Sequence, residues 1–161
     1  MTKKINKHVE NVKEFHRLAG QGILDKPTIP SEKIRILRAR LILEEAIETI
    51  YALGVDFGVG VGENAITHSY KFDFFNFIIA TDREPNLTEI ADGCADITVV
   101  TTGTQLECGI PIEEVQEEVD QSNLAKFTGD YKIREDGKVI KPLNWKAPDI
   151  KSILKKHGWE G

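Results

Sequence analysis

The stretch "LILEEAIETI", residues 41–50, places three glutamates inside an otherwise apolar run: Glu44, Glu45 and Glu48. At about 100° per residue, Glu44 and Glu48 continue a helical line that begins with leucines, and Glu45 lies beside it. Apolar lines on the other sides make the segment apolar nearly all round, which is typical of a buried helix. Because buried carboxylates are costly unless they are paired or bind a metal, the pattern favours anionic ligands held inside the protein. The alternative is the solvated face of an ordinary amphipathic helix.

A second acidic motif, "EIADGCAD" at residues 89–96, repeats this arrangement. Its acids stand at i, i+3 and i+7 and share one helix face: Glu89, Asp92 and Asp96. The residues between them are small, which allows another helix to approach closely: Ala91, Gly93, Cys94 and Ala95. Glu89 has an alternative role, since Asn86 three positions earlier would complete a capping box. Two such helices side by side would form an oxygen-rich cage suited to a hard divalent cation, Mg²⁺ or possibly Mn²⁺.

A carboxylate cage of this kind usually handles phosphates, because Mg²⁺ takes few protein ligands and shares its other positions with substrate oxygens. Cationic side chains that could receive a polyphosphate lie in "SNLAKF" and "DGKVIKP": Lys126, Lys138 and Lys141. From spacing alone, ordinary surface lysines are the better interpretation of all three. The glycine-rich "GVGVGE" is no P-loop, since it lacks Gly-Lys-Ser/Thr and a following helical pattern. His16 lies beside the apolar face of its helix, where packing is its more common role.

Hydrophobic periodicity and capping residues predict the elements that position these motifs. Four substantial helices are expected over residues 4–19, 31–53, 86–109 and 112–127, with a short final helix over 147–158. A hairpin is expected around Asp136-Gly137. The predicted fold class is therefore all-α, a bundle of four core helices with a small C-terminal β-hairpin. The alternative is an α+β fold in which the glycine-rich middle of the chain pairs with the tail.

Length and composition restrict the class of protein further. A chain of 161 residues suits a single domain, here 1–161, with an insertion at about 54–85 and the hairpin tail at about 130–161. The net charge of −5 argues against a general nucleic-acid binder, and no apolar run is long enough to span a membrane. The chain start lacks a signal-peptide core, and Cys94 and Cys108 lie in no metal-ligand spacing. A cytoplasmic location is therefore expected.

Taken in order, these motifs resemble those of the all-α nucleoside-triphosphate pyrophosphohydrolases, the MazG-like group. "LEEAIE" matches the EExxE element of that group and "EIADGCAD" its ExxD element. The closer resemblance is to the phosphoribosyl-ATP pyrophosphohydrolase-like branch, through "EFHR", "SNLAK" and "DGKVIKP" in the same order. The similarity covers residues 12–142. One departure is the gap between the acidic motifs, 89 − 48 = 41 positions, which is longer than is usual in the family.

The resemblance implies a helical bundle that binds Mg²⁺ and cleaves a nucleoside triphosphate to monophosphate and pyrophosphate. It implies roles for ten residues, with Glu44 and Glu45 as catalytic groups or water-positioning groups. The metal ligands would be Glu45, Glu48, Glu89, Asp92 and Asp96, and the substrate-binding residues Asn123, Lys126, Lys138 and Lys141. Homodimers or dimers of dimers, with sites completed across subunits, are also implied.

Two other functions stay open at this point. The chain could be the dedicated phosphoribosyl-ATP pyrophosphohydrolase of histidine biosynthesis, although the long insertion and extended tail favour nucleotide-pool housecleaning. It could instead be a non-enzymatic helical oligomerisation or binding module whose acids meet basic side chains of a partner. The choice of base, sugar and attacked phosphorus does not follow from the sequence. Metal binding separates the enzymes from the binding module.

Overall fold

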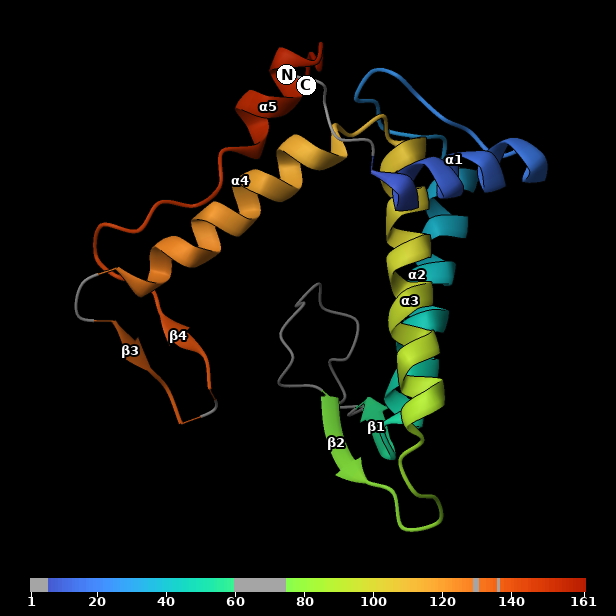
Figure 1. The fold of residues 1–161 in the computed structure, drawn as a ribbon, viewed down its shortest axis with the longest axis vertical. Helices are drawn as coiled ribbons and strands as arrows, with labels where there is room; N and C mark the ends of the chain where they lie inside the picture. Colours follow the sequence, from blue (N-terminus) through green and yellow to red (C-terminus); the bar gives the residue numbers. More distant parts are fainter. Residues whose placement is uncertain (1–5, 60–74, 129–130, 136) are drawn as a thin grey trace, which may run out of the picture. The chain divides into compact units, whose positions relative to one another are not determined.

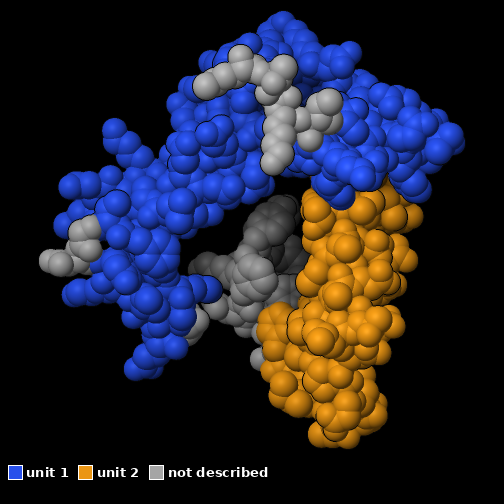
Figure 2. Space-filling view, viewed as in Figure 1, with its two compact units in different colours: residues 1–31, 102–161 blue, residues 32–101 orange. Residues whose placement is uncertain are grey.

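The structure of the chain is a computed structural model that describes residues 6–59, 75–128, 131–135 and 137–161. Its secondary structure is mainly helical, with two small antiparallel strand pairs (Figure 1). The chain divides into two compact units, which are coloured separately in Figure 2. One unit comprises residues 32–101, and the other comprises residues 1–31 together with 102–161.

The unit of residues 32–101 consists of two long helices and a hairpin between them. Helix α2 spans Glu32–Ala52, and α3 spans Leu87–Glu107, of which the part up to residue 101 belongs to this unit. Strands β1 (Val55–Val59) and β2 (Phe75–Ile79) pair antiparallel, with Val55 opposite Ile79. The two helices approach each other closely where Gly93 of α3 faces Thr49 of α2.

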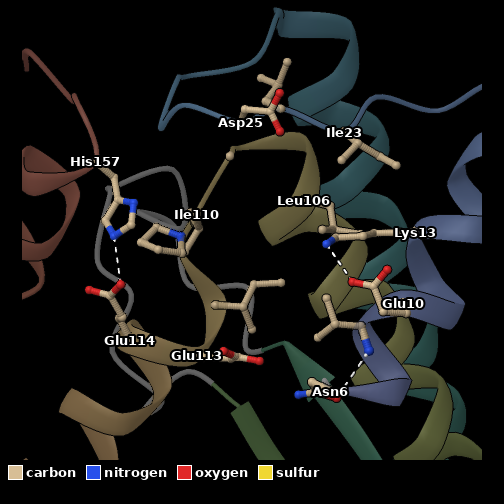
Figure 3. A pocket seen from close by; sticks show the side chains of 15 residues that line it. Asn6, Glu10, Lys13, Ile23, Asp25, Leu106, Ile110, Glu113, Glu114 and His157 are labelled. Carbon is tan, nitrogen blue, oxygen red and sulfur yellow. Dashed lines mark hydrogen bonds and ion pairs between the residues drawn. The ribbon is translucent and has the colours of Figure 1, made fainter. Parts of the chain in front are cut away.

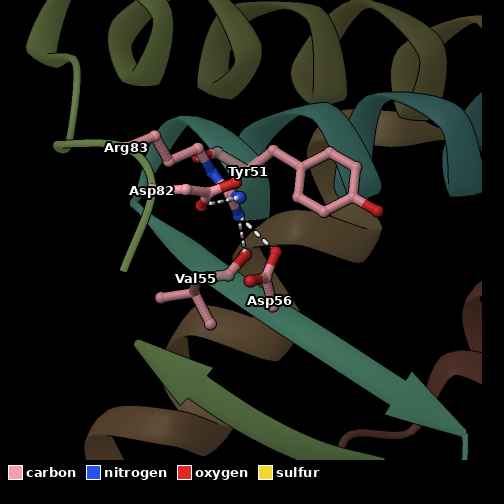
Figure 4. Close-up of polar contacts among 5 residues, drawn as sticks. All are labelled: Tyr51, Val55, Asp56, Asp82 and Arg83. Atoms are coloured by element: carbon pink, nitrogen blue, oxygen red, sulfur yellow. Dashed lines mark hydrogen bonds and ion pairs between the residues drawn. The ribbon is translucent and has the colours of Figure 1, made fainter. Parts of the chain in front are cut away.

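Turn residues and one arginine connect these elements. Gly54 ends α2 with a φ of +69°, a left-handed conformation that favours glycine. Arg83 then joins the end of α2 to β1: its guanidinium donates to the backbone oxygens of Tyr51 (3.2 Å) and Val55 (2.9 Å) and to the Asp56 carboxylate (2.6 Å) (Figure 4). The same guanidinium lies 5.0 Å from the centroid of the Tyr51 ring. Arg83 therefore fixes the hairpin to the helix.

The other unit contains three helices, the last turns of α3 and a second hairpin. Helix α1 spans Lys7–Ala19, α4 spans Ile112–Leu124 and α5 spans Ile150–Lys156. A 3-10 turn, η2 (Ala125–Phe127), extends α4, and strands β3 (Lys132–Ile133) and β4 (Val139–Ile140) pair antiparallel.

A buried polar contact joins α1 to α3 in this unit. His16 is 1% exposed, and its Nδ1 lies 3.0 Å from the Gly22 oxygen. The Gly22 N–H donates to Glu107 Oε1 at 3.0 Å, and Glu107 is also buried. Val9, Val12 and Leu106 form the apolar core beside it. His16 therefore has the packing role expected from the sequence.

The all-α prediction with a small hairpin is confirmed, and the helix boundaries agree closely with those expected. The tail hairpin turns at Gly137, whose φ is +80°. The glycine-rich middle pairs with itself in β1 and β2 within the described residues, not with the tail as in the α+β alternative. Most of that middle segment, residues 60–74, lies outside the described residues. No helix in the described parts of the chain is both long and apolar enough to cross a membrane.

One expectation about packing is wrong for the single chain. Helix α2 was expected to be buried, but of its residues only Arg38 and Thr49 are buried, and the structure describes all 21. Large apolar side chains remain exposed along it: Ile36, Leu37, Leu43 and Tyr51. Helix α2 does carry apolar side chains nearly all round, but contacts within one chain do not bury them.

Candidate functional site

The crossing of α2 and α3 brings the two acidic motifs together. A Cβ atom placed on Gly93 of α3 would lie 3.2 Å from Thr49 Cβ of α2, so the two backbones approach closely there. Thr49 is buried, and its hydroxyl donates a hydrogen bond to the backbone oxygen of Glu45 at 2.7 Å. Asp92 adjoins Gly93 and Asp96 lies one turn further on, which places both acids near Glu45. The predicted close approach at the small residues is confirmed at Gly93.

The charges around Glu45 show that these acids form one cluster. Partial burial raises the pKa of the Glu45 carboxyl above its ordinary value of 4.5. The negative charges of four neighbours raise this pKa further: Asp96, Glu48, Glu44 and Asp92. Two of these neighbours lie on α2 and two on α3. We refer to Glu44, Glu45, Glu48, Asp92 and Asp96 as the acidic face.

Among the described residues, no basic side chain neutralises the acidic face. Within the described parts of the chain, none of its five carboxylates has an ion pair or a hydrogen bond to a Lys, Arg or His side chain. Other acids in the molecule do have such partners. The pKa of Glu114, for example, is held below its ordinary value by hydrogen bonds from Lys156 and His157.

Glu89 belongs to the same face of α3 but lies one turn before Asp92. Only one of the two hydrogen-bonding halves of a capping box between Asn86 and Glu89 is present. Asn86 Oδ1 accepts from the N–H groups of Thr88 (3.0 Å) and Glu89 (3.4 Å), as an N-cap does. The Asn86 N–H, which a capping-box glutamate would accept, instead donates to the Ala52 oxygen at 2.9 Å. The Glu89 carboxylate is therefore not used as a cap.

The acidic face is more open than the sequence pattern indicated. Glu45 and Asp96 are half-buried, whereas Glu44, Glu48 and Asp92 are exposed. Among the described residues, no three His, Cys, Asp or Glu side chains are arranged closely enough to hold a metal ion as they stand. The donor set is nevertheless entirely carboxylate oxygen, the kind that Mg²⁺ and Mn²⁺ prefer. The residues therefore fit a hard divalent cation by chemistry.

The substrate-binding residues expected from the sequence lie in the other unit, and three of them meet around one tryptophan. Lys126 Nζ donates to Asn123 Oδ1 at 2.7 Å and lies 5.4 Å from the centroid of the Trp145 ring. Lys141 Nζ lies 4.3 Å from the same centroid. We refer to Asn123, Lys126, Lys141 and Trp145 as the lysine–tryptophan cluster. Lys138 follows Gly137 at the hairpin turn, and its C=O accepts a hydrogen bond from the Arg134 N–H at 2.9 Å.

Sequence reasoning missed Trp145. The Trp145 indole is half-buried, and its Nε1–H donates to the backbone oxygen of Ser122 at 2.8 Å. The Ser122 hydroxyl in turn donates to the backbone oxygen of Lys146 at 3.1 Å. These bonds hold the tail against α4. The one signal in the sequence is an aromatic residue four positions after Lys141 in "KPLNW", in a segment without helical or strand periodicity.

A cavity of about 410 Å³ also lies in this unit, between α1, the α3–α4 turn and α5 (Figure 3). Its walls combine apolar side chains such as Leu106 with carboxylates. Two of these carboxylates already have cationic partners: Glu10 pairs with Lys13 at 2.8 Å, and Glu114 pairs with His157 at 3.0 Å. None of the residues singled out from the sequence lines it. The cavity therefore does not have the uncompensated charge of the acidic face.

Comparison with known proteins agrees with this arrangement. The family described as phosphoribosyl-ATP pyrophosphohydrolase matches residues 12–123. The match covers about two thirds of the chain and includes both acidic motifs and Asn123, whereas Lys126, Lys138, Lys141 and Trp145 follow it. No curated protein matches the chain.

Proposed function

The chain belongs to the phosphoribosyl-ATP pyrophosphohydrolase family, and we propose that it is a divalent-metal-dependent nucleoside triphosphate pyrophosphohydrolase. It would release a nucleoside monophosphate and pyrophosphate, in keeping with a role in nucleotide-pool housecleaning. The family indicates a pyrophosphohydrolase of the MazG-like type. The observation that carries the finer proposal is the acidic face, in which five carboxylates share one surface and have no cationic partner in the described parts of the chain.

The acidic face is suited to hold Mg²⁺ or Mn²⁺. Carboxylates that lie close together gain free energy when a cation arrives, because the cation replaces repulsion with attraction. Glu45, Glu48, Asp92 and Asp96 would supply the ligands, with Glu89 one turn away on α3. Several of these side chains are exposed and can rotate toward a common ion. When bound, the metal would neutralise phosphate charge and activate a water for attack.

Glu45 is the best placed of these residues to accept a proton. A general base works best when its pKa lies near the working pH, and burial and like charge both raise the pKa of Glu45 toward neutrality. Glu44, which is exposed, is the alternative base.

The lysines of the tail would receive the polyphosphate. Lys126 and Lys141 have neutral partners, an amide oxygen and an indole ring, so their charges stay available to an anion. An ammonium group can donate up to three hydrogen bonds, which leaves room for phosphate oxygens. Asn123, hydrogen-bonded to Lys126, would contact the nucleotide beside it, and Lys138 would add charge at the hairpin turn.

A second copy of the chain would cover α2. Leu43 is 59% exposed and Ile36 is 46% exposed, which is unusual for a helix that is apolar nearly all round. Burial of this face in a homodimer or a dimer of dimers would remove apolar area from water. Light scattering after gel filtration measures the mass directly. A monomer at micromolar concentration would contradict this part of the proposal.

The decisive experiment for the reaction is a substrate panel with Mg²⁺ or Mn²⁺, with all products identified. The proposal predicts monophosphate plus pyrophosphate from at least one nucleoside triphosphate, and no turnover in excess chelator. Turnover of phosphoribosyl-ATP alone would identify the dedicated biosynthetic enzyme instead. Release of orthophosphate only, or equal activity in chelator, would contradict the proposal. Absence of both turnover and metal binding would favour the binding module.

A further inference from the structure

We infer that Trp145 is a positioning residue for polyphosphate, which it serves by holding the ammonium groups of Lys126 and Lys141. The inference rests on the proposed function, in which these lysines receive the phosphates. It adds a residue that lies outside the family match and that no sequence motif singled out.

The geometry around the indole carries the inference. Lys141 Nζ is 4.3 Å and Lys126 Nζ is 5.4 Å from the ring centroid, both within the range of a cation–π contact. The two lysines come from different elements, η2 and the segment after β4, and the ring is the feature they share. Without it, two flexible side chains with like charge would tend to separate.

The indole is itself fixed, so it can act as a platform. Its Nε1–H donates to the Ser122 oxygen at 2.8 Å, and Ser122 Oγ donates to the backbone oxygen of Lys146, the next residue. A ring anchored at its polar edge keeps its π faces in place for the lysines. An ion pair would have held a lysine equally well but would have neutralised its charge, whereas an aromatic ring leaves the full charge for an anion.

The ring therefore lowers the cost of ordering the lysines when phosphate binds. Immobilising a long side chain costs free energy on binding, and a side chain already held in place avoids part of that cost. Polyphosphates, with several adjacent anionic groups, use two neighbouring ammonium groups better than a single phosphate does. The cluster thus selects for pyrophosphate and triphosphate chains over orthophosphate.

Calorimetric titration with inorganic pyrophosphate, in chelator, tests this directly. Trp145→Leu should weaken binding about fivefold or more, and Trp145→Phe should weaken it less, because phenylalanine keeps a weaker π face. Glu118→Ala is the matched control, since it removes the bond that the Asp149 N–H donates to Glu118 and so loosens the tail from α4 without touching the ring or its anchor, and its pyrophosphate affinity should not fall below that of the wild type. With a nucleoside triphosphate, Trp145→Leu should raise KM while kcat stays nearly constant.

A fluorescence signature separates positioning from mere support of the tail. The chain has two tryptophans, so Trp159→Phe leaves Trp145 as the sole emitter. Its emission should change with pyrophosphate and saturate at the concentration found by calorimetry. Unchanged affinity in Trp145→Leu, or equal losses in Glu118→Ala and Trp145→Leu, would overturn the inference. If Lys126→Ala and Lys141→Ala weaken binding while Trp145→Leu does not, the proposed function stands and only the inference fails.

Discussion

The acidic face and the lysine–tryptophan cluster differ in the sign of their charge, but both leave that charge uncompensated. On the acidic face, carboxylates adjoin other carboxylates, and the pKa of Glu45 is raised as a result. In the cluster, lysines adjoin an amide and an indole and have no acid partner among the described residues. Several other acids of the described residues are paired with bases, as Glu114 is with Lys156 and Asp56 is with Arg83.

The gathering of like charges in each region supports the proposed binding of ligands there. A folded chain gains modestly from pairing exposed charges, so unpaired groups of one sign need another reason to be gathered. In the proposed function, a divalent cation would supply that reason for the acidic face, and a polyphosphate would supply it for the lysines.

The largest effect is expected from Glu48→Gln, which tests the acidic face. The substitution keeps the shape of the side chain but removes a metal ligand, so activity should fall by more than about 100-fold, the upper end for loss of a group that only orients ligands. Steady-state assays at saturating Mg²⁺ measure this. Glu84→Gln, an exposed glutamate in the loop before α3, is the control and should retain activity. Full activity in Glu48→Gln would remove this residue from the site.

Gly93→Ala tests whether the helix crossing creates the acidic face. Glycine to alanine within a helix normally stabilises by up to about 1 kcal/mol. Here the added methyl would lie 3.2 Å from Thr49 Cβ and even closer to its hydroxyl, so the sign should reverse, with a loss of about 1–3 kcal/mol of stability. Urea unfolding measures the difference. Cys94→Ala, at the exposed neighbouring position, should be nearly neutral. A stabilised Gly93→Ala variant would mean that the two helices are further apart.

The double substitution Lys126→Ala and Lys141→Ala tests the positive charge of the lysine–tryptophan cluster. Loss of two charge-assisted hydrogen bonds to phosphate should raise KM about tenfold or more, while metal affinity stays nearly constant. Lys151→Ala, an exposed lysine on α5 in the same unit, is the control and should leave KM unchanged. Kinetics with the best substrate of the panel give the answer. Equal KM values for the wild type, the double variant and Lys151→Ala would show that Lys126 and Lys141 are ordinary surface lysines.

The smallest effect is expected from the pH dependence of Glu45. Because its pKa is raised in the folded state, the fold binds this proton more tightly than the unfolded chain does, and stability falls as pH rises above 4.5. In chelator, Glu45→Gln should therefore melt slightly higher than wild type at pH 7, and the difference should shrink toward pH 4.5. Thermal melts across this range measure it. A Glu45→Gln variant that melts lower at pH 7 would indicate a stabilising partner for the carboxylate.

Much of the fold was predictable because its signals are local. Asn86 and Gly109 define the ends of α3 through capping chemistry and a positive φ, and both act as expected. Helical spacing placed the acids on shared faces, and Gly93 indicated where a second helix could approach. The hairpin in the tail followed from Gly137.

The remaining features depend on contacts that spacing does not encode. The apolar pattern of α2 predicted burial, but periodicity cannot tell burial within one chain from burial by a second copy. The attachment of β1 to the end of α2 depends on Arg83, which reaches backbone oxygens about thirty positions earlier in the sequence. Trp145 meets Lys126 only because the tail returns along α4. Such contacts between distant segments left no periodic signal in the sequence.

The central claim, that the acidic face binds a divalent cation, is tested most directly by thermal melts with and without Mg²⁺. Wild type and Glu48→Gln are each compared in chelator and in excess Mg²⁺. The account predicts that Mg²⁺ raises the wild-type midpoint by mass action and raises the variant's much less. In chelator the variant should melt at or slightly above the wild type, since one repelling charge is gone. A variant that melts far lower in chelator, yet shows the wild-type Mg²⁺ shift, would contradict the account.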